Sequence, residues 1–244
     1  INMNYSQYQP ISKDLFKILK VAKEVENLSN GYYNIMLGKV SSSLGFAPDF
    51  GKNTLQEIAT SYDLDEKNNS LIRYSENWFD LSSIAKGYAV QKIHNYLSKN
   101  NLNNHLIDIG GEIIISGSKK GKPWNIGIQN PLSKIESSTI TINNGKYEFL
   151  AIASSGEYRN FIYDNSGNKI THTINPKTLT SINNKILSVT VISETSATYA
   201  DAFATAFNAM GVKNAMNVSN ENNISTMIIY RNNNDVKTIY SDKW

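Results

Sequence analysis

The sequence contains no cysteine, and this absence excludes disulfides, thiolate metal sites and cysteine nucleophiles. It also has no apolar run close to the ~18 residues of a membrane-spanning helix. Its net charge is only +3, and its lysines and arginines are scattered along the chain instead of forming a stripe. A basic face for nucleic acid is therefore not predicted.

The composition is that of an ordinary globular protein, with 40% hydrophobic and 18% charged residues among 244. No linker, low-complexity spacer or repeat divides the chain, so we expect one domain over residues 1–244. The chain starts at Ile1 and not at methionine, so a signal peptide or lipid-anchored N-terminus would lie outside it. The absence of cysteine is compatible with export.

The first hundred residues favour two amphipathic helices. Apolar residues at helical spacing predict the first over 14–28, with Asn30-Gly31 ending it. The second, over 84–97, is expected to bury Ile84, Val90, Ile93 and Leu97. Between them we expect an irregular segment over 31–48, a short helix over 54–60, and a hairpin over 62–81 that turns at 67–69.

The second half is rich in β-branched runs separated by Asn-Gly or Ser-Gly turns. Strands are predicted within 105–117, 123–131, 138–155, 159–174 and 185–193. A helix over 196–210, capped by Ser196 or Thr198 and closed by Gly211, precedes a short helix and a hairpin over 225–241. Helices and meandering strands in separate blocks indicate an α+β fold with an antiparallel or mixed sheet and packed helices.

The segment "DLSSIAKGYAV", residues 80–90, places a carboxylate, serines, a lysine and a glycine at the start of a helix. Asp80 with Ser82 or Ser83 can cap that helix. Lys86 does not fit simple capping, because the first turn of a helix prefers an anion. Either Lys86 lies in solvent, or this helix start binds something negative such as a phosphate.

A second cluster, "ADAFATAF", places Asp201 and Thr205 one turn apart on an apolar helix. Burying an acid there is costly without a partner. The two oxygens suit Mg²⁺, which binds few protein ligands and keeps phosphate oxygens. Alternatively, Asp201 assists the helix cap and Thr205 bonds back to its own helix.

The chain has three histidines, and His172 in "THTINPKT" differs from the other two. It alternates with apolar residues at a strand end before a turn, a position from which it can serve as a general base. A structural role is the alternative. His94 and His105 are interpreted as structural or solvated.

Seven segments in the same order resemble the ApbE-type FAD:protein FMN transferases: "DLSSIAKGYAV", "LIDIGGEI", "GKPWNIGIQNP", "ASSGEYRNF", "THTINPKT", "SVTVIS" and "ADAFATAF". The resemblance runs from about Gly31 to Met210. It implies a T-fold-related α+β fold that binds FAD and Mg²⁺. It also implies that the family's N-terminal strand, with its Met-Gly-Thr motif, and the segment that follows it lie before Ile1, or that the flavin site is incomplete.

The resemblance also implies a set of site residues. His172 matches the catalytic histidine. The Ser83 carbonyl, Asp201 and Thr205 would hold Mg²⁺, with the Ala204 backbone joining them. The residues expected to contact FAD are Tyr32, Tyr33, Asn34, Asp80, Lys86, Gly110, Gly111, Ser155, Gly156 and Ile174.

The implied reaction is Mg²⁺-dependent transfer of FMN from FAD to a threonine or serine hydroxyl of a redox protein, with release of AMP. The implied location is extracytoplasmic, with an N-terminal lipid anchor. The alternatives are FAD hydrolysis to FMN and AMP, and non-catalytic FAD binding. The family usually has the pattern His-x-x-Asp-Pro-x-Thr-Gly. This chain has Asn175 in place of the aspartate and Leu179 in place of the glycine. It also has Asn34 where an aspartate is common.

Overall fold

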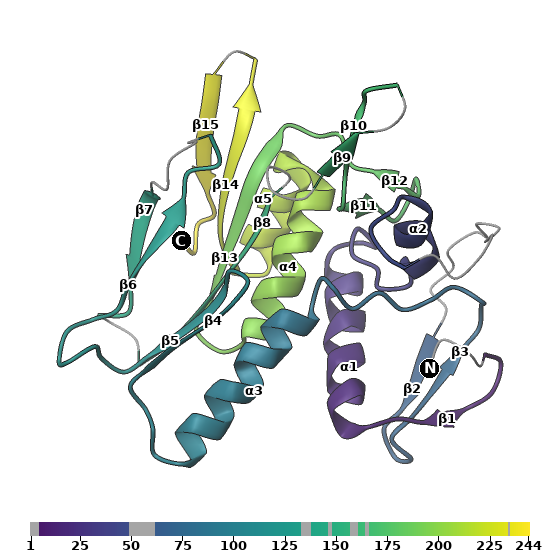
Figure 1. Cartoon of the computed structure of the whole chain (residues 1–244), viewed down its shortest axis with the longest axis horizontal. Coiled ribbons are helices and arrows are strands. Elements are labelled where there is room, and N and C mark those ends of the chain that lie inside the picture. Colours follow the sequence, from purple (N-terminus) through teal and green to yellow (C-terminus); the bar gives the residue numbers. More distant parts are fainter. Residues whose placement is uncertain are drawn as a thin grey trace.

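A six-stranded antiparallel sheet forms one side of the molecule (Figure 1). The computed structural model describes residues 5–48, 62–132, 138–145, 148–156, 161–163, 166–233 and 235–244. The strand order is β15-β14-β13-β8-β5-β4. The strands are β4 His105–Ile109, β5 Glu112–Ser116, β8 Phe149–Gly156, β13 Ile186–Ser193, β14 Ser225–Asn232 and β15 Asp235–Tyr240.

The sheet is covered on both faces, as the alternation along β8 shows. Ala151 and Ala153 pack toward the helices, whereas Leu150 and Ile152 pack against β6. Successive residues of a strand point to opposite faces, so a strand covered on both sides must be apolar throughout. The covering helices are α3 Ala85–Lys99, α4 Ala197–Met210 and α5 Val212–Glu221, and the covering hairpin is β6 Asn125–Gln129 with β7 Ser138–Asn143.

Helix α4 lies between the sheet and α1, which spans Lys13–Leu28 (Figure 1). Its sequence is mostly alanine and phenylalanine, and almost all of its residues are buried. Small alanines let the neighbouring backbones approach, while Phe203 and Phe207 stack with ring centroids 5.3 Å apart. The helix starts at Ser196, whose side chain accepts a hydrogen bond from the Tyr199 N–H.

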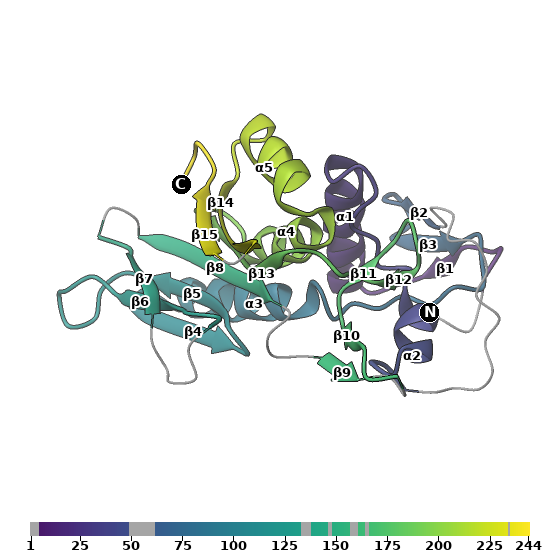
Figure 2. The same cartoon turned by 90° about the horizontal axis from the view of Figure 1, so that it is seen from above.

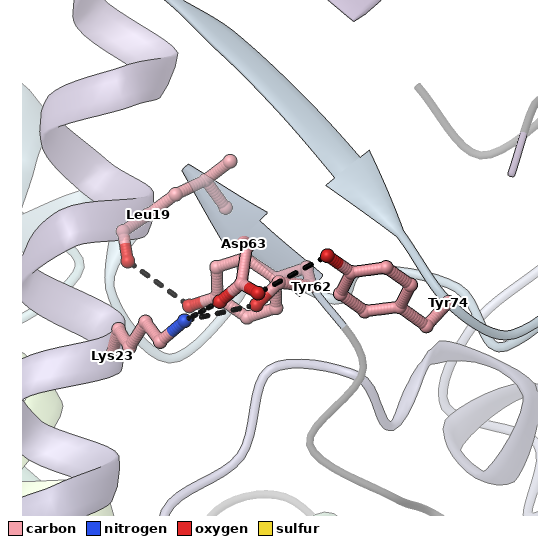
Figure 3. Close-up of polar contacts among 5 residues, drawn as sticks. All are labelled: Leu19, Lys23, Tyr62, Asp63 and Tyr74. Atoms are coloured by element: carbon pink, nitrogen blue, oxygen red, sulfur yellow. Dashed lines mark hydrogen bonds and ion pairs between the residues drawn. The ribbon is translucent and has the colours of Figure 1, made fainter. Parts of the chain in front are cut away.

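A small sheet, β1-β3-β2, packs beside α1 (Figure 1). Its strands are β1 Gln9–Pro10, β2 Tyr62–Asp65 and β3 Ser70–Arg73. Figure 3 shows how Lys23 of α1 reaches this sheet by donating to the Tyr62 carbonyl at 3.0 Å and pairing with Asp63. Tyr62 donates to the Leu19 carbonyl at 3.0 Å, and Tyr74 donates to Asp63 at 3.2 Å.

The remaining elements are short and lie beside one another in both views (Figure 2). They are α2 Gly38–Ser43, β9 Phe161–Tyr163, β10 Lys169–Thr171, β11 Ile174–Asn175 and β12 Thr180–Ser181. β9 pairs with β10 and β11 pairs with β12, all antiparallel.

The predicted α+β class is confirmed, as are the helices over 14–28 and 196–210 and the hairpin of β2 and β3. Two expectations were wrong. The segment 31–48 contains the helix α2, and Ile93 is 41% exposed because it lies on the outer face of α3. The helix expected over 54–60 lies outside the described residues. Across those residues, no helix combines the length and apolar character needed to cross a membrane.

Candidate active site

A cavity of about 1140 Å³ opens where the sheet, the start of α3 and α4 meet. Its wall is built from stretches that lie far apart in the sequence: 32–37, 80–86, 108–113, 126–129, 152–156, 172–176 and parts of α4. Its volume is slightly above the roughly 300–1,000 Å³ that is typical of small-molecule and cofactor sites.

Helices α3 and α4 meet at Gly87, directly beside the cavity. The Gly87 N–H donates to the Asp201 carboxylate at 2.8 Å, in a buried contact. A Cβ at Gly87 would lie 2.4 Å from the Ala197 carbonyl oxygen, so only glycine fits. Asp201 thus satisfies an N–H in the first turn of α3 from another helix.

This arrangement corrects the expected cap of α3. The residue at the cap position is Ile84, which makes no side-chain hydrogen bond to the helix. Asp80 accepts from the Ser82 N–H at 2.9 Å, which closes a local turn instead. Asp80, Ser82 and Ser83 are therefore free to line the cavity.

The cavity wall is acidic among its described residues. Asp80, Asp108, Glu112 and Asp201 line it, and Lys86 is the lysine among them. Burial, with the charge of Glu112 acting in the same direction, raises the pKa of Asp201 to about 7. The hydrogen bond from Gly87 and the charge of Lys86 lower this pKa, but they offset the effect of burial only in part.

Lys86 forms an ion pair with Glu112 of β5, whose side chain is only 4% exposed. Burial raises the pKa of Glu112, although the hydrogen bond from Lys86 acts against it. Sequence reasoning missed Glu112. The available signal was an acid directly after Gly110-Gly111 at the start of an apolar strand, where a charge is costly to bury.

The segment before α2 supplies the aromatic part of the wall. Tyr33 is buried, and its hydroxyl lies 3.0 Å from the Ser83 hydroxyl. Asn34 accepts from the Met36 N–H at 2.7 Å and donates to Glu26 of α1 at 3.2 Å. These bonds fix the path of residues 32–36 along the cavity.

Two turns bring backbone close to the cavity. Gly110 and Gly111 have φ of +63° and +99°, a region that favours glycine, and the Gly111 N–H donates to Asp108 at 2.9 Å. At the end of β8, the Ser155 hydroxyl accepts from Asn208 of α4 at 3.3 Å.

His172 lines the cavity in the segment between β10 and β11. Its neighbours hold this segment in place: the Thr171 N–H donates to the Ser181 hydroxyl at 2.7 Å, and the Ile182 N–H donates to the Thr173 carbonyl at 3.0 Å. The ring of Phe46 meets the His172 ring edge to face, with centroids 6.3 Å apart.

All but one of the residues expected at the site line this cavity. The exception is Ala204, whose side chain packs in the core between α4 and its neighbours. Its backbone as a metal ligand stays a prediction. The residues brought together are Tyr32, Tyr33, Asn34, Asp80, Ser83, Lys86, Gly110, Gly111, Ser155, Gly156, His172, Ile174, Asp201 and Thr205.

Comparison with known proteins gives a consistent result. The pattern described as the ApbE family matches residues 1–228. The chain belongs to the ApbE family. It is 31% identical to a protein of Vibrio cholerae named FAD:protein FMN transferase, over 96% of the chain and 72% of that relative. A protein of the same name from Haemophilus influenzae is 31% identical over 93% of the chain and 69% of its own length.

Solved structures show the same fold. The flavin transferase ApbE from Vibrio cholerae superposes with a TM-score of 0.85 at 28% identity, over 99% of this chain and 79% of that one. The apo form of the Pseudomonas stutzeri flavinyl transferase ApbE gives a TM-score of 0.83 at 22% identity, over 99% and 77%.

The departures from the ApbE pattern have local explanations. Asn175 accepts from the Lys177 N–H at 2.9 Å, which is the turn-forming contact that an aspartate would also make. Asn34 likewise keeps its backbone contact with Met36. Leu179 adopts φ of +58°, a left-handed conformation that glycine accepts more easily.

The ApbE cavity fits a hard divalent cation. Asp201 is 4% exposed with a raised pKa, and it shares the wall with Thr205 and Ser83. A carboxylate, a hydroxyl and a carbonyl are oxygen ligands of the kind that Mg²⁺ prefers, completed by water or phosphate oxygens. A bound cation would also supply the positive charge that this acidic wall lacks.

Proposed function

We propose that the chain transfers FMN from FAD to a threonine or serine hydroxyl of an acceptor protein and releases AMP. The acidic cavity wall carries this proposal. A diphosphate would be repelled by Asp80, Asp108, Glu112 and Asp201 unless a cation lay between them. A substrate carrying a diphosphate–metal unit therefore suits this cavity, and FAD, which the relatives named FAD:protein FMN transferase use, carries a diphosphate.

The residues divide the work between binding and proton transfer. Lys86 and the turn at Gly110-Gly111 would face the diphosphate, and Tyr32 and Tyr33 would line the ring-binding part. Asp201, Thr205 and the Ser83 carbonyl would hold Mg²⁺, which neutralises charge on the phosphates. Positioning and electrostatics then supply most of the rate.

His172 would act as general base. The acceptor hydroxyl gives its proton to the imidazole while its oxygen bonds to the phosphorus on the FMN side of FAD. The bond from that phosphorus to the bridging oxygen breaks, and AMP leaves with that oxygen. A base so placed contributes about 10²–10⁴-fold to the rate.

The acceptor would be a redox protein carrying a threonine or serine at its flavinylation site. We also propose that transfer takes place outside the cytoplasm, with the enzyme tethered by a lipid anchor that precedes this chain. The family resemblance and a cysteine-free composition support this location.

Incubation of the purified chain with FAD, Mg²⁺ and an acceptor domain tests the proposal. The acceptor mass should increase by FMN less one water, with one AMP released per acceptor. AMP and free FMN beside an unmodified acceptor would instead identify an FAD hydrolase. FAD that stays intact for hours would identify a flavin-binding protein without catalysis.

The His172→Ala variant separates binding from chemistry. It should bind FAD with little change and lose transfer by at least about a hundredfold. The matched control is His94→Ala, which removes a histidine outside the cavity. Near wild-type transfer by the His172 variant would remove His172 from the proposed mechanism.

A further inference from the structure

His94 and His105 form a pair outside the cavity. His94 lies in α3, and His105 is the first residue of β4. The Nδ1 atom of His94 lies 2.9 Å from the Nε2 atom of His105. Phe149 packs edge to face on the His94 ring, with centroids 4.7 Å apart. Both imidazoles are half-buried and are carried by regular elements.

A backbone contact fixes the proton of His105. Its Nδ1 atom lies 2.7 Å from the Leu102 carbonyl oxygen, which can only accept a hydrogen bond. Nδ1 therefore carries the proton, and the lone pair of Nε2 points at His94. A histidine that binds a metal usually donates its other ring N–H to a carbonyl or carboxylate in this way.

We propose that His94 and His105 form a binding site for a divalent transition-metal ion that prefers imidazole, with Cu²⁺ held more tightly than Ni²⁺ or Zn²⁺. Metal–imidazole bonds are about 2.0–2.1 Å long. Two such bonds at a right angle place their nitrogens roughly 2.9 Å apart, so the spacing of the two nitrogens fits, and each ring turns by about 45° to aim its lone pair at the metal. The order of affinities follows from the general preference of nitrogen sites.

Binding leaves the proton count of the neutral pair unchanged. In the metal-free pair the His94 Nδ1–H donates to His105 Nε2. When the metal binds both nitrogens, the His94 proton moves from Nδ1 to Nε2, and His105 keeps its proton on Nδ1. Water fills the other coordination positions, since no cluster of three or more metal-binding side chains occurs in the described part of the chain.

This site is chemically and spatially distinct from the proposed Mg²⁺ site. His94 lies eight residues beyond Lys86, which is about 12 Å along the axis of α3. Mg²⁺ prefers oxygen ligands, whereas imidazole favours Cu²⁺, Ni²⁺ and Zn²⁺. Excess Mg²⁺ should therefore not displace the metal from the histidine pair.

Calorimetric titration of the untagged chain with Cu²⁺, Ni²⁺ and Zn²⁺, in excess Mg²⁺ at about pH 7.5, tests the proposal. One ion should bind per chain, and the melting temperature should rise by several degrees when the metal is well above its dissociation constant. His94→Gln and His105→Gln should each weaken binding about tenfold or more. Nitrogen-15 NMR should show the His94 proton moving between ring nitrogens.

The third histidine provides the matched control. His172→Gln should bind the metal like the wild type, and all three variants should keep the wild-type far-ultraviolet circular dichroism. Absence of one-to-one binding would overturn the proposal. So would wild-type affinity in His94→Gln, or an equal loss in His172→Gln, because the metal would then lie elsewhere.

Discussion

Two lysine–carboxylate pairs in this protein have the same chemistry and opposite consequences. Lys23 and Asp63 are 38% and 53% exposed, and the hydrogen bond from Lys23 lowers the pKa of Asp63. Lys86 is 43% exposed, but its partner Glu112 is only 4% exposed, and burial raises the pKa of Glu112. The outer pair helps to fasten the β2–β3 hairpin to α1 (Figure 3). In the cavity pair, the carboxylate of Glu112 is buried, and its burial lowers the stability of the fold. Such unfavourable burial of a charge is typical of binding sites.

Asp201→Asn should have the largest effect on the cavity side of this comparison. The asparagine carbonyl can still accept from Gly87, so the α3–α4 contact is kept. The charge that would bind Mg²⁺ is lost, and FMN transfer should fall about a thousandfold, which corresponds to ~4 kcal/mol in the barrier. Steady-state AMP release at several Mg²⁺ concentrations measures this. If Asp201→Asn has wild-type activity at the Mg²⁺ concentrations that the wild type needs, Asp201 does not bind the metal.

The same substitution should stabilise the metal-free fold. The pKa of Asp201 is raised to about 7 in the folded state, so the unfolded chain releases this proton first as pH rises. Stability of the wild type therefore falls between about pH 4 and pH 7, and the cost remains above that range. Thermal unfolding in EDTA at pH 8 should give a higher melting temperature for Asp201→Asn. A lower one would show that the carboxylate is needed for folding.

Lys86→Met tests the cavity pair directly. The methionine keeps much of the side-chain packing but leaves Glu112 buried without its cation. We expect a loss of about 2 kcal/mol, less than for a fully buried pair because Lys86 is partly exposed. The loss should grow from pH 5 to pH 8, since Glu112 must ionise, and urea unfolding at both pH values measures it. Lys92→Met is the control, because Lys92 pairs with Asp14 in an exposed position on the same helix. Equal losses in the two variants would erase the distinction between buried and exposed pairs.

Leu179, beside the cavity, has an unfavourable backbone conformation that also lowers stability, by less than the burial of Glu112 does. Its φ of +58° is unfavourable for a residue with a side chain, while its side chain packs against the cluster of Leu37, Val40 and Ile174. Leu179→Ala and Leu179→Gly both lose this packing, but only glycine relieves the backbone. Glycine should therefore be more stable than alanine by about 1 kcal/mol, the reverse of the usual order. Chemical unfolding of both variants decides this, and a more stable alanine variant would mean that the turn relaxes.

The sequence predicted the parts of this protein that depend on local periodicity or on family motifs. Helix α1 follows from its apolar spacing, and most of the predicted cavity residues follow from seven collinear segments. Prediction from the sequence failed where contacts between residues far apart in the chain decide the local structure. The first turn of α3 is bonded by Asp201, more than a hundred residues away, so capping by Asp80 could not be rejected from local sequence.

Glu112 and the histidine pair also depend on contacts between elements that are distant in the sequence. The burial of Glu112 depends on β5 lying next to β8 and on Lys86 reaching across from α3. His94 and His105 are read separately as ordinary histidines, and their 2.9 Å contact exists only because α3 packs on β4. The pattern of residues within one segment does not predict which side chains of another segment it will contact.

Lys23→Met should have the smallest effect on stability. The pH dependence of this effect should differ from that of Lys86→Met. The pair is exposed, so its loss should cost about 0.5 kcal/mol and shrink further in high salt. Because the folded-state pKa of Asp63 is lowered, the pair contributes above the unfolded pKa of an aspartate and is lost as pH falls below it. The loss in Lys23→Met should thus disappear only below about pH 4 and stay constant above it, whereas the loss in Lys86→Met should keep growing from pH 5 to pH 8. Urea unfolding across this range, with Lys20→Met as an exposed control on the same helix, gives the two pH dependences. A Lys86→Met loss that stays constant from pH 5 to pH 8 would mean that burial of Glu112 does not govern the cavity pair.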